Sequence, residues 1–262
     1  MSRLGRDFTD VDSTPDPSRC VSYLDAVAAV EPVAAGKRRR DLLLGLRPGD
    51  VALDVGCGTG EDVRALAGLV GADGRVVGFD ASRALIAEAR RRTPAEYGAV
   101  QFIVGDAHQL PFEDEAFDAA RIERTLQHVE DPGRVLCELV RVVRPGGVIV
   151  ACEPDWGTLV LDAADPELVR LLERVASGVI RHGWIGRQLR GRLLDAGCAD
   201  VEVIAETVVI DDYETVQQLG NIEAVIALEP RLEALVVDLR SRAARGRLFV
   251  SQTMFTVCGR VT

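Results

Sequence analysis

A glycine-rich turn near residue 56 is the first part of the chain whose residue types and spacing indicate chemistry. Residues 53–60 read LDVGCGTG and stand between an apolar run and a helical pattern. Glycine adopts positive φ without strain and lets a ligand approach the backbone, so such a turn can hold a ligand against the N-terminus of the following helix. A plain strand-to-helix turn and a dinucleotide site are the two alternatives.

The spacing of the glycines and the carboxylate before them disfavour a dinucleotide. A dinucleotide fingerprint has the form GxGxxG and leaves room for a pyrophosphate, whereas here the third glycine falls one residue early. Asp54 precedes the first glycine, Gly56. A carboxylate at that place repels an anion and attracts an ammonium or a sulfonium. S-adenosylmethionine carries both of these cations and no phosphate, so it fits the turn better than a dinucleotide does.

The same turn resembles the first motif of a known enzyme family. Residues 54–60 are similar to that motif in the class I S-adenosylmethionine-dependent methyltransferases, above all in the ubiquinone/menaquinone-biosynthesis-like enzymes and related bacterial small-molecule methyltransferases. Further segments follow in the family's order: Asp80 at the end of the second strand, GDAHQLPF at 105–112, Phe117-Asp118 opening the fourth strand, and RPGG at 144–147. The resemblance is strong over roughly residues 49–152 and elsewhere rests on the order of elements.

The resemblance implies a role for each of these segments. Asp80 would hold both ribose hydroxyls, and Asp106 would bind the adenine amino group with help from the backbone of the next residue. Tyr23, in the N-terminal helix, would close over the methionine part of the cofactor. Glu123 and Arg124 follow the fourth strand and would line the same pocket. The cofactor-binding residues expected on this basis are Asp54, Gly56, Cys57, Gly58, Thr59, Gly60, Asp80, Ala81, Gly105, Asp106, Ala107, His108, Glu123, Arg124 and Tyr23.

Two titratable residues after later strands are candidates for the chemistry of the acceptor. An amine acceptor need only lose its proton, whereas a hydroxyl or a carbon acid usually needs a general base. His128 follows the fourth strand at the sheet edge where ligands bind in such folds, and histidine suits proton removal near neutrality. It could instead serve to pack a loop. Glu153 ends the fifth strand and could orient His128, bind a substrate hydroxyl, or only cap the strand.

Aromatic residues in or beside a segment inserted after the fifth strand are the expected contacts of the acceptor. They are Trp156, His182 and Trp184. In relatives this segment forms a lid over the acceptor, and aromatic walls suit a planar or apolar substrate. The alternative is that these side chains belong to the core of a small cap.

The elements that must position these residues alternate as they do in a parallel sheet covered on both faces. Apolar runs predict strands at 51–55, 76–80, 100–104, 117–122 and 148–152, with helices between them at 61–70, 82–92 and about 131–144. An inserted helix starts at Asp165-Pro166, a further helix covers 186–196, and strands at 201–210 and 252–259 are separated by helical sequence at about 214–242.

We therefore expect an α/β, Rossmann-like fold. Its sheet would be mostly parallel and seven-stranded, with helices on both faces, an antiparallel last strand and a helical lid inserted after strand five. Residues 1–45 would form an N-terminal helical lid, which opens with a polar segment through Ser18 and continues as helical sequence from about 21 to 44. Residues 46–262 would form the methyltransferase domain, with the inserted cap at about 154–186.

The net charge and the cysteine spacing limit the kinds of partner that the protein can bind. The formal net charge is −10, whereas a protein that binds a phosphate backbone needs a concentrated positive surface. The one dense basic run, residues 37–40, stands beside Asp41 and is interpreted as the solvated end of a helix. The six cysteines show no CxxC and no metal-like spacing to histidine. We expect a cytoplasmic monomer or homodimer without a metal, a nucleic-acid partner or a membrane partner.

Methyl transfer from S-adenosylmethionine to an oxygen, nitrogen or carbon of a small molecule, in a biosynthetic pathway, is the leading hypothesis. The chain lacks the Asn/Asp-Pro-Pro-aromatic motif after the fourth strand that marks amino-methylation of bases or glutamine. A protein that binds the cofactor without transferring its methyl group, as a cyclase or a regulator, is the alternative. A nicotinamide enzyme is disfavoured by the glycine spacing.

Overall fold

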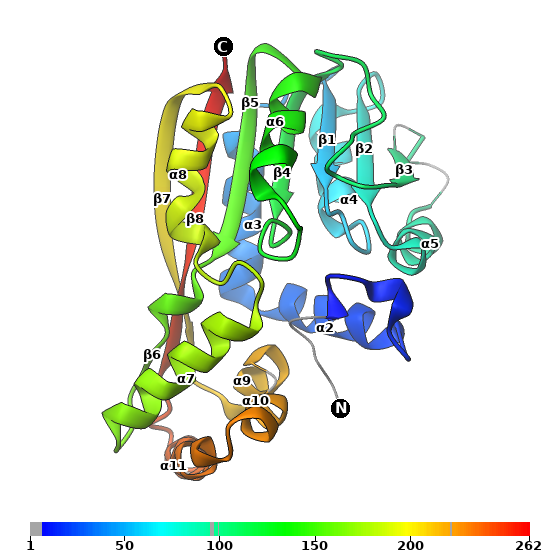
Figure 1. The fold of residues 1–262 in the computed structure, drawn as a ribbon. Coiled ribbons are helices and arrows are strands. Elements are labelled where there is room, and N and C mark those ends of the chain that lie inside the picture. The colour runs from blue at the N-terminus through cyan, green and yellow to red at the C-terminus, as the bar shows by residue number, and fades with distance from the viewer. Residues whose placement is uncertain (1–6, 95–96, 99, 221) are drawn as a thin grey trace.

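A mixed sheet forms the centre of the protein (Figure 1). The computed structural model describes residues 7–94, 97–98, 100–220 and 222–262. Five parallel strands lie in the order β3-β2-β1-β4-β5, and β8 runs antiparallel beside β5 and pairs with both β7 and β6. Their bounds are β1 Val51–Val55, β2 Arg75–Asp80, β3 Val100–Val104, β4 Phe117–Glu123, β5 Val143–Pro154, β6 Val160–Leu161, β7 Cys198–Ile210 and β8 Val250–Val261.

This topology confirms the expected Rossmann-like fold and differs from it in one strand. The sheet has eight strands within the described residues, because β6 adds a two-residue strand that pairs with Ser251 and Val250 of β8. A strand of two residues is too short to produce a recognisable alternation of apolar and polar side chains. The parallel strands are apolar along most of their length because helices cover both faces of the sheet.

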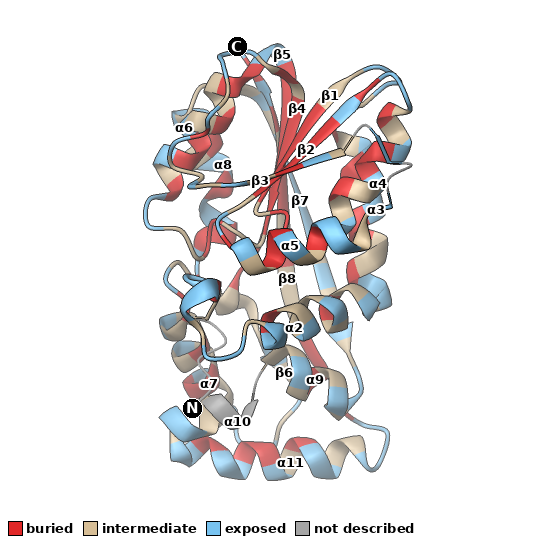
Figure 2. Cartoon of the chain, turned by 90° about the vertical axis from the view of Figure 1, so that its right-hand side faces the viewer, coloured by how far each residue is buried: buried red, intermediate tan, exposed pale blue. Residues whose placement is uncertain are grey.

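Helices pack on both faces of the sheet (Figure 2). On one face, α6 (Pro132–Val142) and α8 (Ile185–Asp195) share a core with the strands through residues such as Leu139 and Leu189. On the other face, α3 (Glu31–Leu43), α4 (Glu61–Val70) and α5 (Arg83–Arg92) lie over the sheet, and Val63 and Ile86 are fully buried there. Side-chain caps start two of these helices at the residues expected from the sequence: Ser82 accepts from the Leu85 amide, and Asp131 from the Arg134 amide.

The N-terminal helical region is two helices instead of the single stretch expected at about 21–44. Helix α2 covers Ser18–Ala29 and α3 starts at Glu31. Val30 between them is extended, with φ −75° and ψ 108°, and Pro32 stands in the first turn of α3. Proline has no amide hydrogen and its ring clashes with the carbonyl four residues earlier, so a helix cannot run through it unbroken. The break lets α2 cross the carboxyl ends of the strands while α3 packs along the sheet.

A small second core joins the inserted segment to the helices that follow β7. Helix α7 (Pro166–Val179) contributes Leu171 and Leu172, and α11 (Glu233–Ala243) contributes Leu235, Val236 and Leu239. Between β7 and α11 lie α9 (Tyr213–Gly220), α10 (Ile222–Leu228) and a 3₁₀ turn at Pro230–Leu232. From here on, "the cap" means α7, α9, α10 and α11 together, which is more than the inserted segment alone. Within the part of the chain that the structure describes, no helix is both long and apolar enough to cross a membrane.

Candidate functional site

A cavity of about 1020 Å³ lies where the parallel strands end. Its floor is formed by the loops that follow β1, β2, β3 and β4, one side by α2, and the far side by α7, α9 and α10 of the cap. In open parallel sheets ligands bind at the carboxyl ends of the strands. The sequence-predicted residues from all four loops therefore meet in one place.

The glycine turn needs glycine for two different reasons. Gly56 and Gly58 have φ values of 75° and 53°, which side chains with a Cβ rarely adopt. A Cβ on Gly56 would stand 1.9 Å from Thr125 Oγ1, so this glycine lets the loops after β1 and β4 touch. A Cβ on Gly58 would point across the cavity toward Leu24 Cδ1 at 3.1 Å. Gly60 does not line the cavity, and a Cβ there would meet the Phe102 ring at 2.7 Å.

Asp80 accepts a hydrogen bond from the glycine turn, and its carboxylate oxygens can accept further hydrogen bonds. Its Oδ2 accepts from the Gly58 amide at 2.9 Å and its Oδ1 from the Ser82 amide at 2.9 Å. Burial raises the pKa of this carboxyl, although the two backbone hydrogen bonds lower it. A carboxylate has about four acceptor positions, so both oxygens can accept again. This is the geometry that two vicinal hydroxyls require.

The loop after β3 places a second aspartate at the cavity. His108 holds Asp106 through its backbone amide at 2.9 Å and its Nδ1 at 2.6 Å. Because the Asp131 amide donates to His108 Nε2 at 3.0 Å, the ring proton sits on Nδ1 and donates to Asp106. These bonds, the backbone one first, lower the pKa of Asp106. Both hydrogen bonds go to Oδ1 of Asp106, whose side chain is 72% exposed.

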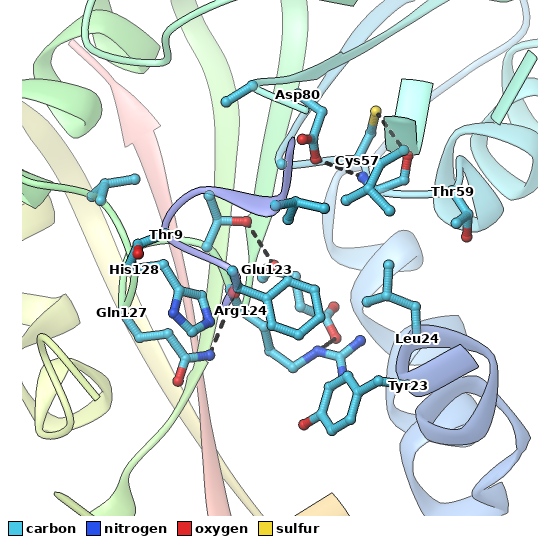
Figure 3. Close-up of a pocket in the computed structure, with 18 of the residues that line it drawn as sticks. Thr9, Tyr23, Leu24, Cys57, Thr59, Asp80, Glu123, Arg124, Gln127 and His128 are labelled. Atoms are coloured by element: carbon cyan, nitrogen blue, oxygen red, sulfur yellow. Dashed lines mark hydrogen bonds and ion pairs between the residues drawn. The ribbon is translucent and has the colours of Figure 1, made fainter. Parts of the chain in front are cut away.

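The N-terminal segment at residues 7–13, which we call the strap, crosses the cavity. Phe8, Thr9 and Val11 line the cavity, and the Phe8 ring lies 5.4 Å from Tyr23 and 5.7 Å from His128. Figure 3 shows Thr9 beside His128 at this end of the site. Within the strap, Asp12 accepts from the Ser82 hydroxyl at 2.6 Å and from the backbone amides of residues 83 and 84 at 2.8 and 3.1 Å. The strap is thus tied to the start of α5, next to Asp80.

The basic run at residues 37–40 is not the solvated helix end expected from the sequence. The side chains of Arg38 and Arg39 are 64% exposed, whereas those of Lys37 and Arg40 are 9% and 5% exposed. Asp41 is also buried. Residues three and four apart lie on one face of a helix, so positions 37, 40 and 41 point inward together. The interpretation failed because partners for these charges lie far away in the sequence.

Arg121 on β4 is the centre of the buried charges. Its Nη1 lies 2.7 Å from Asp41 Oδ1, its Nη2 lies 2.6 Å from Glu123 Oε2 and 3.3 Å from Asp62 Oδ2, and its Nε lies 3.6 Å from Asp54 Oδ1. The four carboxylates hold the pKa of Arg121 above its usual range despite burial, which lowers it. Sequence reasoning missed Arg121, although an arginine inside an otherwise apolar strand is a usable signal.

Lys37 and Arg40 complete this ionic cluster. Lys37 Nζ donates to Glu61 at 2.8 Å and to Asp62 at 3.1 Å. Arg40 binds both oxygens of Glu123 at 3.0 Å through Nε and Nη2. Burial raises the pKa of Asp62, but Arg121 and Lys37 together lower it by more, so that it falls to about 2. The cluster connects α3, β1, α4 and β4 beneath the cavity.

His128 and Glu153, the two candidates for the chemistry, occupy different places. His128 lines the cavity on the loop after β4. Glu153 does not line it: its side chain is fully buried, and its Oε1 accepts from the backbone amides of Thr125 and Leu126 at 2.8 and 2.6 Å. Glu153 therefore holds the loop that carries His128. Burial raises the pKa of Glu153 to about 8, although those two amides lower it.

Of the three aromatic residues expected near the acceptor, one lines the cavity. Trp156 does so, and its Nε1 donates to Gln127 Oε1 at 2.9 Å. His182 lies behind the cavity wall, where its Nε2 lies 3.0 Å from the Val129 carbonyl oxygen. Trp184 is 51% exposed, and the Arg187 guanidinium lies over its ring at 5.1 Å.

Comparison with known proteins identifies the family. The methyltransferase domain family matches residues 53–151. A 37.1 kDa protein in transposon TN4556 of Streptomyces fradiae, itself uncharacterized, is 41% identical over 269 residues, which cover 100% of this chain and 76% of that protein. The demethylmenaquinone methyltransferase of Bacillus mycoides is 37% identical over 138 residues, 52% of this chain and 58% of that enzyme.

The chain is a class I S-adenosylmethionine-dependent methyltransferase. Solved structures agree on the fold. The YcgJ protein of Bacillus subtilis matches with a TM-score of 0.63 at 17% identity and covers 87% of this chain and 98% of its own. The [4+2]-cyclase SpnF matches with a TM-score of 0.54 at 24% identity over 87% of this chain and 82% of its own.

The cavity of this methyltransferase fits S-adenosylmethionine, which supplies a methyl group on a positively charged sulfur when bound. Asp54 is 2% exposed and lines the cavity, and its Oδ2 has no hydrogen-bond partner among the described residues, as an ammonium-binding oxygen requires. Burial raises its pKa to about 8, although Arg121 lowers it. Asp80 offers the acceptors that a ribose needs. All the expected cofactor residues except Gly60 line the cavity.

Replacing the centre of the ionic cluster should destabilise the methyltransferase strongly. Arg121→Leu leaves Asp41, Asp54, Asp62 and Glu123 buried without their shared cation, and we expect the free energy of unfolding to fall by roughly 3–5 kcal/mol. Urea denaturation measures this loss. Arg38→Leu, on the exposed face of α3, is the control and should change the value by less than about 0.5 kcal/mol. Equal stability of the two variants would contradict a structural role for the cluster.

Glu153 should make stability depend on pH. Its pKa is raised from 4.5 to about 8 in the folded protein. The folded state therefore keeps a proton that the unfolded state loses, and the contribution is complete below pH 4.5 and is lost as the pH rises to 8. Glu153→Gln keeps the oxygen that accepts from Thr125 and Leu126 and cannot ionise. Between pH 5 and pH 8 the wild type should therefore lose about 3–4 kcal/mol of unfolding free energy relative to this variant. A difference that stays constant across this range would show that Glu153 titrates normally.

Proposed function

We propose that this methyltransferase transfers the methyl group to a small, neutral and largely apolar molecule in a biosynthetic pathway. The observation that carries the proposal is the lining of the cavity beyond the cofactor residues. Aliphatic side chains from α7 and the residue after it, from α9 and from α10 form this part of the wall: Ala176, Val179, Ile180, Leu219, Val225, Ala227 and Leu228. We call this part the acceptor chamber.

The volume and the charges of the chamber support a small neutral acceptor. Pockets for one drug-sized ligand measure about 300–1,000 Å³, so about 1020 Å³ gives room for the cofactor and a second small molecule. The charged residues at this end are Glu130 and Arg181, and both are exposed at its rim. A charged acceptor would have to leave water without a buried counter-charge. The net charge of −10 disfavours a nucleic-acid acceptor.

His128 is the proposed general base. It lies on the cavity wall between the cofactor residues after β4 and the chamber, with the Phe8 ring against it. Figure 3 shows His128 next to Gln127. The Gln127 side chain donates to the Arg124 carbonyl at 3.4 Å and accepts from Trp156, which together fix one wall of the site. In this arrangement His128 removes the proton of a hydroxyl or an acidic carbon, and the apolar wall keeps water out.

A screen of candidate acceptors tests the proposal, with adenosylhomocysteine release as the signal and mass spectrometry of the products. Neutral apolar alcohols and phenols should gain one methyl group, whereas cationic amines and oligonucleotides should not. Ala176→Phe narrows the chamber and should lower turnover at least tenfold, while the affinity for adenosylhomocysteine stays within about twofold. Methylation of charged acceptors by both proteins would refute the apolar chamber.

The same mass measurement tests the second candidate function, a cyclase that uses the cofactor without transferring its methyl group. The shared fold with the [4+2]-cyclase SpnF favours keeping this candidate. A product with the composition of its substrate, formed without adenosylhomocysteine, would support it. A product with one added methyl group supports methyl transfer.

His128→Ala should lower turnover by roughly 10²–10⁴, the usual contribution of a positioned base, and leave the affinity for adenosylhomocysteine nearly unchanged. Steady-state kinetics and calorimetry measure the two effects separately. A fall in cofactor affinity or in melting temperature instead would assign His128 to packing of the loop after β4. An active variant would point to an acceptor that is already nucleophilic.

A further inference from the structure

Strand β7 forms a free edge of the sheet. It pairs with β8 from Cys198↔Val261 to Ile210↔Val250, and with no other strand among the described residues. Figure 1 shows β7 as the outermost strand, at the end of the sheet opposite β3. With 13 residues it is longer than most strands. The backbone groups on its outer side are therefore a long template for a further strand.

Hydrogen bonds of β8 show which residues of β7 turn their backbone groups outward. The Thr253 amide donates to Thr158 Oγ1 at 3.0 Å, and the Thr253 carbonyl accepts from the Asp155 amide at 3.0 Å. Thr253 thus turns both groups away from β7, where its register partner is Thr207. Opposite residues in an antiparallel pair either bond to each other or both turn their groups outward. The backbone groups of Thr207 and of the other odd-numbered residues at 203–209 therefore face the free edge.

This edge lacks the features that usually prevent the addition of a strand. Natural edge strands carry lysine or proline, contain a bulge, or are covered by another element. The register shift between β7 and β8 lies between Ala199 and Glu202, before this part of the strand. Residues 203–210 read VIAETVVI, without lysine or proline. Val203 and Val209 are 45% and 44% exposed, so the edge is both open and apolar.

Charges on and beside this edge are complementary. Glu206 is the one charged residue at 203–210. It accepts from Arg39 at 2.8 Å and from Arg40 at 3.1 Å, so it does not repel an approaching strand as a free carboxylate would. The Arg39 side chain is 64% exposed and can bind a second carboxylate. Glu202 is exposed and forms no ion pair among the described residues. One copy thus offers a cation and an anion at two places along the edge.

One antiparallel register between two copies of β7 matches these charges. A two-fold axis at Ala205 places Val203 opposite the partner's Thr207, and these outward-facing residues form hydrogen-bonded pairs. It also places Glu202 opposite the partner's Val208. Residues two apart on a strand share a face, so Glu202 then lies on the face that carries the partner's Glu206 and the exposed guanidinium beside it.

The neighbouring registers oppose like charges. An axis at Ile204 places Glu202 directly opposite Glu206, and an axis at Glu206 places this residue opposite its own copy. Like charges directly opposite each other destabilise an antiparallel pair. An axis between two residues would set an outward-facing residue opposite one that is already bonded to β8. The register centred on Ala205 is therefore the favoured one.

We propose that two copies of this chain pair through β7 in this register and form a homodimer with one continuous sheet. Two symmetric ion pairs, from Glu202 of one copy to Arg39 of the other, set the register. The contact is one strand wide, so we expect a weak association, with a dissociation constant in roughly the micromolar range. The inference is independent of the cofactor and of the acceptor.

Light scattering during gel filtration, from about 1 to about 100 µM protein, tests the homodimer. The wild type should approach twice 28.3 kDa at the highest concentration. Ala205→Lys sets two ammonium groups against each other at the axis and should stay monomeric throughout. Val237→Lys is the control, because it adds the same charge at an exposed position on α11 and should dimerise like the wild type.

Proline at two adjacent positions tests the direction of the backbone groups. Thr207→Pro removes an amide that faces the free edge, so it should abolish the dimer. Val208→Pro removes an amide that pairs with β8, so it should lower the melting temperature of the monomer by more than Thr207→Pro does. The two melting curves separate a loss of association from a loss of folding.

Mixing two charge-reversed variants tests the register. Glu202→Arg and Arg39→Glu each set like charges against each other in both ion pairs, so each alone should dimerise at least tenfold more weakly. An equimolar mixture restores opposite charges in both pairs and should form a heterodimer. A strand from an unrelated protein at this edge would not give this result.

Three results would overturn the inference. A wild type that stays monomeric at about 100 µM would leave the edge to a strand of another protein. A dimer that persists in Ala205→Lys and in Thr207→Pro would place the interface elsewhere on the surface. A mixture of the charge-reversed variants that stays monomeric, although the wild type dimerises, would refute the register centred on Ala205.

Discussion

The buried guanidinium of Arg121 is the constraint on which the site depends. A charge without water must be surrounded by opposite charges, and here they come from α3, β1, α4 and β4 itself. The glycine turn lies between two of these partners, since Asp54 precedes it and Asp62 follows it. Its backbone is therefore held at both ends by the same cation. The ionic cluster thus fixes the loop geometry that the apolar core alone would leave free.

Local signals in the sequence were sufficient for most of the sheet and its covering helices. The strands at 51–55 and 100–104 have the predicted bounds, and Ser82 and Asp131 cap the helices that they were expected to start. These features depend on neighbours a few residues away. The sequence does not reveal the two-residue strand β6, which is too short to show a pattern, or the break at Val30, because the helical pattern continues on both sides of Pro32.

The parts of the site that were missed depend on residues distant in sequence. Nothing within residues 37–41 shows that Lys37 and Arg40 are buried, since their partners lie more than twenty and eighty residues away. Asp12 likewise reaches across to the start of α5. Glu153 ends the expected strand, but the direction of its side chain depends on the loop after β4, to which it is bonded. The position of a residue along a strand predicts at which end of the sheet it lies. Its role depends on the side chains and loops that it contacts at that end.

The strands β7 and β8 give the cap an unusual mechanical support. They remain paired from Cys198↔Val261 at one end to Ile210↔Val250 at the other, while β5 leaves the ladder at Pro154↔Met254. The far end of this pair, where β6 also joins β8, enters the core of the cap through Val250 and Ile210, and Figure 1 shows it extending beyond β5 toward α11. The chamber wall is therefore joined to the sheet through β8, the same strand that pairs with β5 beside the cofactor loops, so one strand links the acceptor side of the cavity to its cofactor side.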